Sequence, residues 1–336
     1  MCYNEFIGQM PVRPAKRKGE TPLKAPICLL VSLALLCPLL LGCQAPSSAF
    51  GDTERIKVCA TLFPQYEFAR AVGGERVEVV KLLPGGSESH TYEPSPADIV
   101  TLEDADLFLT TGPSMEPWAD RVISGLSSPP RTLALSLSVP CLEEDDHDHD
   151  HSHDHGHDHA VDPHIWTSPI KAMAMTEAVR DALIELDPEG RAVYEANAAA
   201  YLAELAALDE DLVALSRASE GKTLVFGGRF AFAHLCADYG FAYLSAYRSC
   251  DVSAEPSPAD IAAVIDYIRQ SGTAYLFREE LVEPRTVRTI AEETGAAVLL
   301  LHSCHNVTRA ELESGVSYLS LMQDNLRHLT LALTGQ

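Results

Sequence analysis

The alternation of apolar and polar residues predicts strands and helices that follow one another along the chain. An alternating stretch that turns apolar ("ERIKVCATLFP", 54–64) indicates a strand, and "QYEFARAVGG" (65–74) indicates a helix that ends in glycines. "RVEVVKLLP" (76–84) and "DLFLTTG" (106–112) predict two further strands, with a helix between them that begins after Ser95. This β-α-β-α-β order is typical of a parallel sheet covered by helices.

Residues 168–219 change to an alanine- and leucine-rich pattern with helical periodicity. The one break is "DPEG" at 187–190, where proline and glycine interrupt the helix. The piece from Pro188 to about Ala218 would form a helix about 45 Å long at ~1.5 Å per residue. A helix of this length crosses a domain or joins two, and we expect it to link two lobes.

Strands and helices alternate again beyond residue 219. The expected strands are "KTLVFGG" (222–228), "FAYLSAY" (241–247), "TAYLFRE" (273–279) and "AAVLLLH" (296–302). The expected helices are "FAFAHLCADYG" (230–240), "SPADIAAVIDYIRQSG" (257–272), "VRTIAEETG" (287–295) and an amphipathic C-terminal helix over 311–333. The phrase "EPSPADI" stands at 93–99 and again at 255–261, each time before a capped helix that leads into a strand. Chance agreement between two good helix caps is one explanation, and two topologically related lobes are the explanation we favour.

The predicted fold is therefore α/β, with two lobes that are each a parallel sheet flanked by helices, joined by a long rigid helix. We expect an N-terminal lobe over 54–187, a linking helix over 188–219 and a C-terminal lobe over 220–336. Open parallel sheets bind ligands beyond the carboxyl ends of their strands. The cleft between the lobes is therefore the expected place for a ligand.

The start of the chain has the features of an export signal. Basic residues precede the apolar run "APICLLVSLALLCPLLLG" (25–42), which polar residues follow. The run nearly spans a bilayer, so a transmembrane anchor is the alternative, but its two prolines argue against it. The ending "LLGC" resembles a bacterial lipobox. We therefore expect residues 1–42 to be removed, Cys43 to carry a lipid anchor, and residues 43–53 to form a flexible tether.

Charge and cysteine content narrow the classes of function. The 336 residues carry a formal net charge of −23, which argues against nucleic acid because its binders have basic patches. An acidic surface suits cations, although it also serves solubility. Export permits disulfides, but the cysteines beyond Cys43 are odd in number, so at least one lacks a disulfide partner. Their pairing stays open: Cys59, Cys141, Cys236, Cys250 and Cys304.

Eight of the 13 histidines lie between Glu143 and Trp166. A tract without apolar residues cannot bury a face, so we expect 143–160 to be a disordered loop. Its imidazoles and carboxylates would bind metal weakly, raise the local metal concentration and pass ions to a fixed site. A solvated acidic loop without this role is the alternative. The histidines of this metal-collecting loop are His147, His149, His151, His153, His155, His157 and His159.

Four other histidines stand near predicted strand ends or helix starts. His90 follows the second strand, His164 precedes a helix, and His302 and His305 follow the last strand. These positions converge on the expected cleft. Histidine is the commonest metal ligand near neutral pH, and a tetrahedral set of nitrogen donors suits Zn²⁺. A single loop histidine is more often solvated than bound to a metal. The prediction of a metal site therefore depends on several histidines converging on one place.

Five phrases of the sequence are distinctive: "ATLFPQYEFARAVGG", "LLPGGSESHTYEPSPADI", "ADLFLTTG", "DPHIWTSP" and "YLSLMQDNL". Together they resemble the zinc-binding lipoproteins of bacterial ABC importers, the cluster A-I substrate-binding proteins. The resemblance runs from about Ile56 to Leu333. It implies two α/β lobes, a rigid long helix, a metal ion in the cleft, and delivery to a membrane permease driven by an ATPase.

Two metal ligands of this family carry over onto His90 and His164. The third family position holds Arg229, and arginine cannot bind a metal ion. The fourth falls on His302 when counted from the strand and on His305 when counted back from "SYLSLM". The chain thus resembles a divergent branch of the family.

Other residues are candidates for the missing ligand. Cys250 or Cys304 could bind zinc as a thiolate, although a disulfide or free thiols are favoured in an oxidising compartment. Glu279 and Glu280 are reserve ligands that more plausibly carry surface charge. We expect His234 to be packed inside a helix rather than to bind metal.

The resemblance implies a monomeric lipoprotein on the outer face of the cytoplasmic membrane. It would capture Zn²⁺ and deliver it to an ABC permease and its ATPase, and it would not be an enzyme. A manganese or iron importer component, a surface adhesin-like metal lipoprotein and, less plausibly, a zinc hydrolase remain as alternatives. A hydrolase would need an open metal position and a general base.

Overall fold

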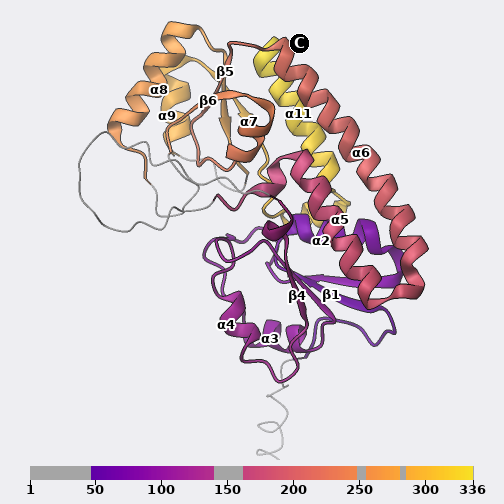
Figure 1. Cartoon of the computed structure of the whole chain (residues 1–336). Helices are drawn as coiled ribbons and strands as arrows, with labels where there is room; N and C mark the ends of the chain where they lie inside the picture. The colour runs from indigo at the N-terminus through magenta and orange to yellow at the C-terminus, as the bar shows by residue number, and fades with distance from the viewer. Residues whose placement is uncertain (1–46, 140–161, 248–254, 281–284, 336) are drawn as a thin grey trace, which may run out of the picture. The chain divides into compact units, whose positions relative to one another are not determined.

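The structure is a computed structural model that describes residues 47–139, 162–247, 255–280 and 285–335 (Figure 1). Three groups of predictions fall outside these residues. They are the export signal with Cys43, the histidine-rich loop, and the cysteines Cys141 and Cys250.

The first lobe contains a four-stranded parallel sheet. Alternating and apolar stretches form strands here because one or both faces of each strand are covered. The strand order is β2 (Val77–Lys81), β1 (Ile56–Ala60), β3 (Leu107–Thr110) and β4 (Arg131–Ala134). In the register of the sheet, Val58 of β1 lies between Val79 and Leu107.

The second lobe repeats this arrangement with four other parallel strands. Their order is β6 (Ala242–Ser245), β5 (Thr223–Phe226), β7 (Tyr275–Arg278) and β8 (Ala297–Leu300). In both sheets the strand that comes first in the chain lies second in the sheet, so the two lobes have the same topology. The prediction of two α/β lobes with parallel sheets is confirmed.

Helices cover the sheets and connect the lobes (Figure 1). The α-helices are α2 (Phe63–Gly73), α3 (Pro96–Glu103), α4 (Ala119–Ile123), α5 (Pro169–Leu186), α6 (Arg191–Ala218), α7 (Ala233–Tyr239), α8 (Pro258–Ser271), α9 (Arg285–Thr294), α10 (Arg309–Ser314) and α11 (Tyr318–Thr334). Short 3-10 helices are η2 (Gly74–Arg76), η3 (Leu135–Ser138), η4 (Ile165–Thr167) and η5 (Pro188–Gly190).

The long helix predicted between the lobes is α6, which has 28 residues and therefore extends for about 42 Å. It contacts α2 and α5, which precede it in the chain, and α7 and α11, which follow it, as Figure 1 shows for α5, α6 and α11. One continuous cluster of buried apolar side chains includes Phe63, Leu205, Phe226 and Tyr318. The lobes thus share a core, which resists a wide hinge movement.

The repeated phrase "EPSPADI" begins the same crossover helix in each lobe. It starts α3 between β2 and β3, and it starts α8 between β6 and β7. Ser95 Oγ accepts a hydrogen bond from Asp98 N at 3.3 Å, and Ser257 Oγ accepts one from Asp260 N at 3.1 Å. The two copies therefore cap structurally equivalent helices.

Two predictions differ from the structure. The first sheet gains β4, which pairs with β3 and was not predicted, although its segment "RTLALSLSV" (131–139) alternates leucine with small or polar residues. The C-terminal helix expected over 311–333 is broken at Gly315, which has a φ of 82° and ends α10. Ser317 then caps α11 through Ser320.

The tether expected over 43–53 does not hang free along its described part. Phe50 is buried beside Cys59 and Leu102. Ala49 N donates a hydrogen bond to Thr101 Oγ1 at 3.0 Å. Residues from Ser47 onward therefore pack against the first lobe.

Within the described residues, every helix is too short or too polar to cross a membrane.

Candidate metal centre

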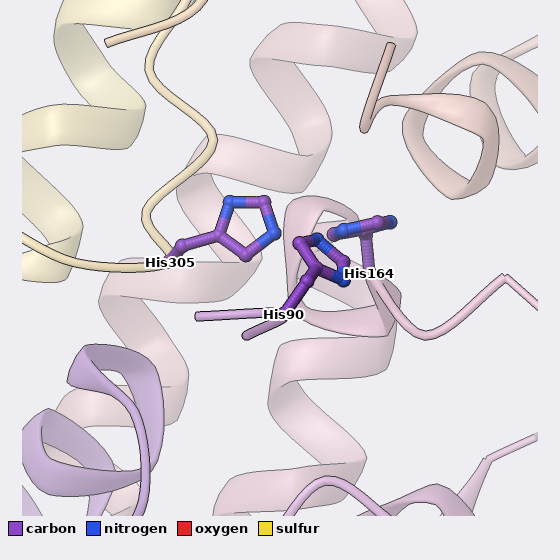
Figure 2. Close-up of side chains that lie close together, drawn as sticks. All are labelled: His90, His164 and His305. Atoms are coloured by element: carbon purple, nitrogen blue, oxygen red, sulfur yellow. The ribbon is translucent and has the colours of Figure 1, made fainter. Parts of the chain in front are cut away.

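Three histidines from distant parts of the chain meet in one place. His90 lies in the loop after β2, His164 directly precedes η4, and His305 follows β8. One nitrogen from each ring lies within 4.8 Å of the others. Figure 2 shows the three imidazoles facing one another. The distance between ring centroids is 5.4 Å for His90 and His164, 5.3 Å for His90 and His305, and 4.5 Å for His164 and His305.

His164 is oriented by the carboxylate of Asp162. The distance from His164 Nδ1 to Asp162 Oδ1 is 2.6 Å, and the backbone N of His164 donates to the same oxygen at 2.8 Å. The carboxylate keeps the proton on Nδ1, so the lone pair of the neutral ring lies on Nε2. Burial lowers the pKa of His164 even though Asp162 favours the charged ring. The residue therefore presents a neutral imidazole, the form that binds metal.

Asp162 remains a carboxylate in this buried position. Burial alone would raise its pKa, but the adjacent His164 outweighs burial and lowers the pKa of Asp162 to about 2. Its backbone oxygen accepts a hydrogen bond from His234 Nε2 at 3.0 Å. His234 is fully buried, and its Nδ1 accepts from Lys171 Nζ at 2.8 Å. His234 is thus packed, as expected, and it supports the loop behind His164.

His305 has one ring nitrogen with a partner and one without. Nδ1 is hydrogen-bonded to Ser303 Oγ, whereas Nε2 is buried and has no hydrogen-bond partner. A buried polar atom without a partner costs free energy of about 1–3 kcal/mol. Burial also lowers the pKa of His305 and keeps the ring neutral. Its orphaned lone pair fits a metal ion held with His90 and His164.

The segment that carries His305 is bonded to the loop that carries His90. Asn306 Nδ2 donates to Pro84 O at 2.6 Å and to Ser87 O at 3.1 Å. Gly86 N donates to Val307 O at 3.0 Å. These bonds hold a loop of the second lobe against a loop of the first, so the two histidines are positioned together.

Trp166 forms one wall of the group. Its ring centroid lies 5.6 Å from that of His164 and 5.3 Å from that of His305. Its Nε1 donates to Ser303 O at 2.7 Å. The indole therefore restricts both imidazoles by packing.

His302 lies outside the group of three among the described residues. Its Nδ1 accepts from Cys304 N at 3.0 Å, and its backbone N donates to Asn325 Oδ1 at 2.7 Å. Of the two positions that the sequence left open, the structure brings His305 to His90 and His164.

The Cys304 thiol is free and fully buried. Burial raises its pKa well above the usual value, which disfavours the thiolate that a metal would need. Cys59 and Cys236 are free and buried as well.

A small cavity of about 20 Å³ lies beside His90 and His305, and Glu88, Arg229 and Glu279 also line it. Arg229 Nε lies 2.6 Å from Glu279 Oε1, and its Nη2 lies 3.1 Å from Glu88 Oε2. Arg229 is therefore next to the histidines, but it bridges two carboxylates.

The expectation that Glu279 and Glu280 carry surface charge is wrong, because both side chains are buried. Glu280 accepts hydrogen bonds from the backbone N and the hydroxyl of Ser303, the N–H bond at 2.7 Å. Burial raises the pKa of Glu279 to about 8. The pKa of Glu280 is lowered, since the effect of His302, His305 and Ser303 exceeds that of burial.

The roles of Asp162, Ser303 and Glu280 were missed at the level of sequence. Asp162 had a signal, because an acidic residue two positions before His164 can reach its Nδ1. Ser303 had none, and Glu280, a reserve ligand in the sequence, gave no sign of its bonds to Ser303, because these bonds join the segments after β7 and β8 in the tertiary structure.

Comparison with known proteins finds relatives that are described as zinc-binding or zinc-uptake proteins. The profile of the ZnuA family, described as zinc-uptake complex component A periplasmic, matches residues 58–332. Zinc-binding lipoprotein AdcA of Streptococcus pneumoniae (strain TIGR4) is 34% identical over 88% of this chain and 59% of that protein. The chain therefore spans about three fifths of the length of this relative. The high-affinity zinc uptake system protein ZnuA of Bacillus subtilis is 29% identical over 86% of this chain and 92% of that protein.

A solved structure has the same fold. It is the Zn(II)-bound ZnuA-like domain of Streptococcus pneumoniae AdcA, with a TM-score of 0.70 and 28% identity. The match covers 83% of this chain and 99% of that one. With two matching lobes, three facing histidines and a profile match over nearly the whole described chain, this protein belongs to the ZnuA family of zinc-uptake components.

Proposed function

We propose that this protein is a substrate-binding lipoprotein that captures Zn²⁺ outside the cytoplasmic membrane and delivers it to an ABC importer. His90, His164 and His305 bind the ion as cargo. The observation that carries the proposal is the buried Nε2 of His305, which has no hydrogen-bond partner and belongs to a group of three facing imidazoles.

The donor set favours zinc over the alternative cargo manganese. Imidazole nitrogen suits zinc, whereas manganese prefers carboxylate, carbonyl and water oxygens. The three facing side chains are all imidazoles. The relatives named above are described as zinc-binding or zinc-uptake proteins, which supports the same cargo.

The shared core supports a transport role over a structural role for the metal. The buried apolar cluster runs through both lobes and the helices between them, so we expect the protein to stay folded without a bound ion. A cargo-binding protein must remain folded when empty in order to be loaded again.

The remaining parts of the proposal concern the lipid anchor, the histidine-rich loop and the partners, and Cys43 and the loop lie outside the described residues. Lipidated Cys43 anchors the protein to the outer face of the membrane. The histidine-rich loop collects metal weakly and passes it to the three histidines. The permease and its ATPase are the partners, and the protein acts as a monomer.

Direct titration tests the proposal. We expect the purified mature protein to bind one Zn²⁺ tightly, and His90→Ala, His164→Ala and His305→Ala each to abolish this binding in competition with a chromophoric chelator. X-ray absorption at the zinc edge should show three imidazole ligands. His328→Ala is the matched control, because His328 bonds Leu300 O from α11 and lies outside the group.

Delivery is tested in cells that lack the gene. The wild-type protein should restore growth in the presence of a zinc chelator, and His164→Ala should not. Tight zinc binding that survives all three histidine substitutions would rule out the proposed site.

A further inference from the structure

We infer that Arg229 determines the metal specificity of the site by holding the Glu88 carboxylate away from the bound ion. This inference rests on the proposed function and concerns how the same site excludes oxygen-preferring cations. Arg229 does not contact the cargo, so it is a positioning residue.

The cavity beside His90 and His305 is rich in carboxylates. Glu88, Glu279 and Glu280 all line it together with Arg229. A cation bound by the histidines would therefore meet oxygen donors at close range. Yet the group of side chains that offer atoms within 4.8 Å of one another contains only the three histidines, among the residues that the structure describes.

Each of these carboxylates is bonded to another group. Glu280 is bonded to the backbone N and the hydroxyl of Ser303. Glu279 Oε1 lies 2.6 Å from Arg229 Nε, and Glu88 Oε2 lies 3.1 Å from Arg229 Nη2. The guanidinium of Arg229 thus forms ion pairs with two of the three carboxylates.

Glu88 is the carboxylate that Arg229 most affects. It lies two residues before His90 in the same loop, and its other oxygen, Oε1, accepts from Ser89 N at 3.1 Å and His90 N at 3.3 Å. Without Arg229, Glu88 Oε2 loses its charged partner while it still faces the cavity. The freed oxygen would then be available to the ion.

The consequence for specificity follows from ligand chemistry. A site of nitrogen donors suits zinc, and an added carboxylate raises the affinity for manganese more than that for zinc. The planar guanidinium can hold two carboxylates at once, which a lysine ammonium does less well. Arg229 thereby limits the side-chain ligands of the ion to the imidazole nitrogens.

The test is a cycle of Arg229→Met, Glu88→Gln and the double variant, with Kd measured for Zn²⁺ and for Mn²⁺. We expect Arg229→Met to shift the affinity ratio towards manganese by about tenfold, the scale on which neighbours of metal ligands act. Glu88→Gln alone should leave the ratio unchanged, and the double variant should restore the wild-type ratio. The control is Arg180→Gln, because Arg180 also pairs with two carboxylates, Glu177 and Asp181, on the surface.

An unchanged ratio in Arg229→Met, with zinc still bound by the wild-type protein, overturns this inference and leaves the proposed function standing. A shift that persists in the double variant also overturns it, because Glu88 would not be the source. A wild-type protein that binds no zinc overturns both. If Arg229→Met does not fold, judged by circular dichroism, Arg229→Lys replaces it, and a shift in the same direction is still required.

Discussion

The orientation of the His164 ring depends on the residues behind it. The carboxylate of Asp162 is hydrogen-bonded to Nδ1 of the ring. The backbone oxygen of Asp162 accepts a hydrogen bond from His234, whose other ring nitrogen accepts one from Lys171. This series of contacts keeps a neutral imidazole in one orientation. Arrangements of this kind raise the basicity of a metal ligand and reduce the entropy that the site loses on binding.

At the residue scale, Asp162→Asn should weaken zinc binding. An asparagine leaves the ring in place but removes the charge that favours the Nδ1–H form, so we expect the affinity to fall about 10- to 100-fold. Chelator competition measures the change. Asp181→Asn, an exposed change on α5, should have no effect, and equal losses in the two variants would contradict this role for Asp162.

Elements in the two lobes follow the same local rules. Ser95 and Ser257 each accept a hydrogen bond from the third residue of the helix they begin, and a proline follows each serine. The repeated phrase therefore marks two equivalent crossover helices. Local signals of this kind act within a few residues, which is why they can be recognised in the sequence.

At the element scale, Ser95→Ala and Ser257→Ala should each lower the free energy of unfolding by about 1 kcal/mol. The loss arises because an amide in the first turn of the helix loses its acceptor. Urea titration of the zinc-free protein measures it, with the exposed Ser128→Ala as the control. A loss of zinc affinity without a loss of stability would show that the caps act on the site instead.

The whole molecule joins its lobes through a shared core and not through a narrow hinge. α6 contacts helices from both halves of the chain, and the segment from His305 to Val307 bonds the loop of the opposite lobe. The three facing histidines are therefore held by contacts within the described residues. Under the proposed function, loading and release of the ion require changes in loops more than a wide opening of the lobes.

At the scale of the whole molecule, deletion of residues 145–160 should leave the tight site nearly intact and lower the total number of zinc ions bound. The reason is that the contacts which position His90, His164 and His305 come from other segments. Isothermal titration calorimetry separates the tight site from weaker ones. Loss of all tight binding in the deletion variant would disprove the idea of a metal-collecting loop.

Most of the fold could be predicted from sequence because periodicity and caps are local. Seven of the eight strands and the break at "DPEG" were predicted in this way. The fourth strand of the first sheet, Arg131–Ala134, was missed although its segment "RTLALSLSV" (131–139) alternates, and its pairing with β3 places it in the sheet. The break at Gly315 was missed because the apolar period continues across it.

The sequence by itself determined the two-lobed parallel architecture, the family, and the candidacy of His90 and His164, because these depend on local patterns and motifs. Only the tertiary structure decided between His302 and His305. Cys304, between them, has a φ of 61°, and this turn sends the two rings to different partners. The structure likewise decided what Arg229 does at the position where the family has a metal ligand. It forms ion pairs with Glu88 and Glu279. Such contacts join residues far apart in the chain, and their distances exist only once both lobes have packed.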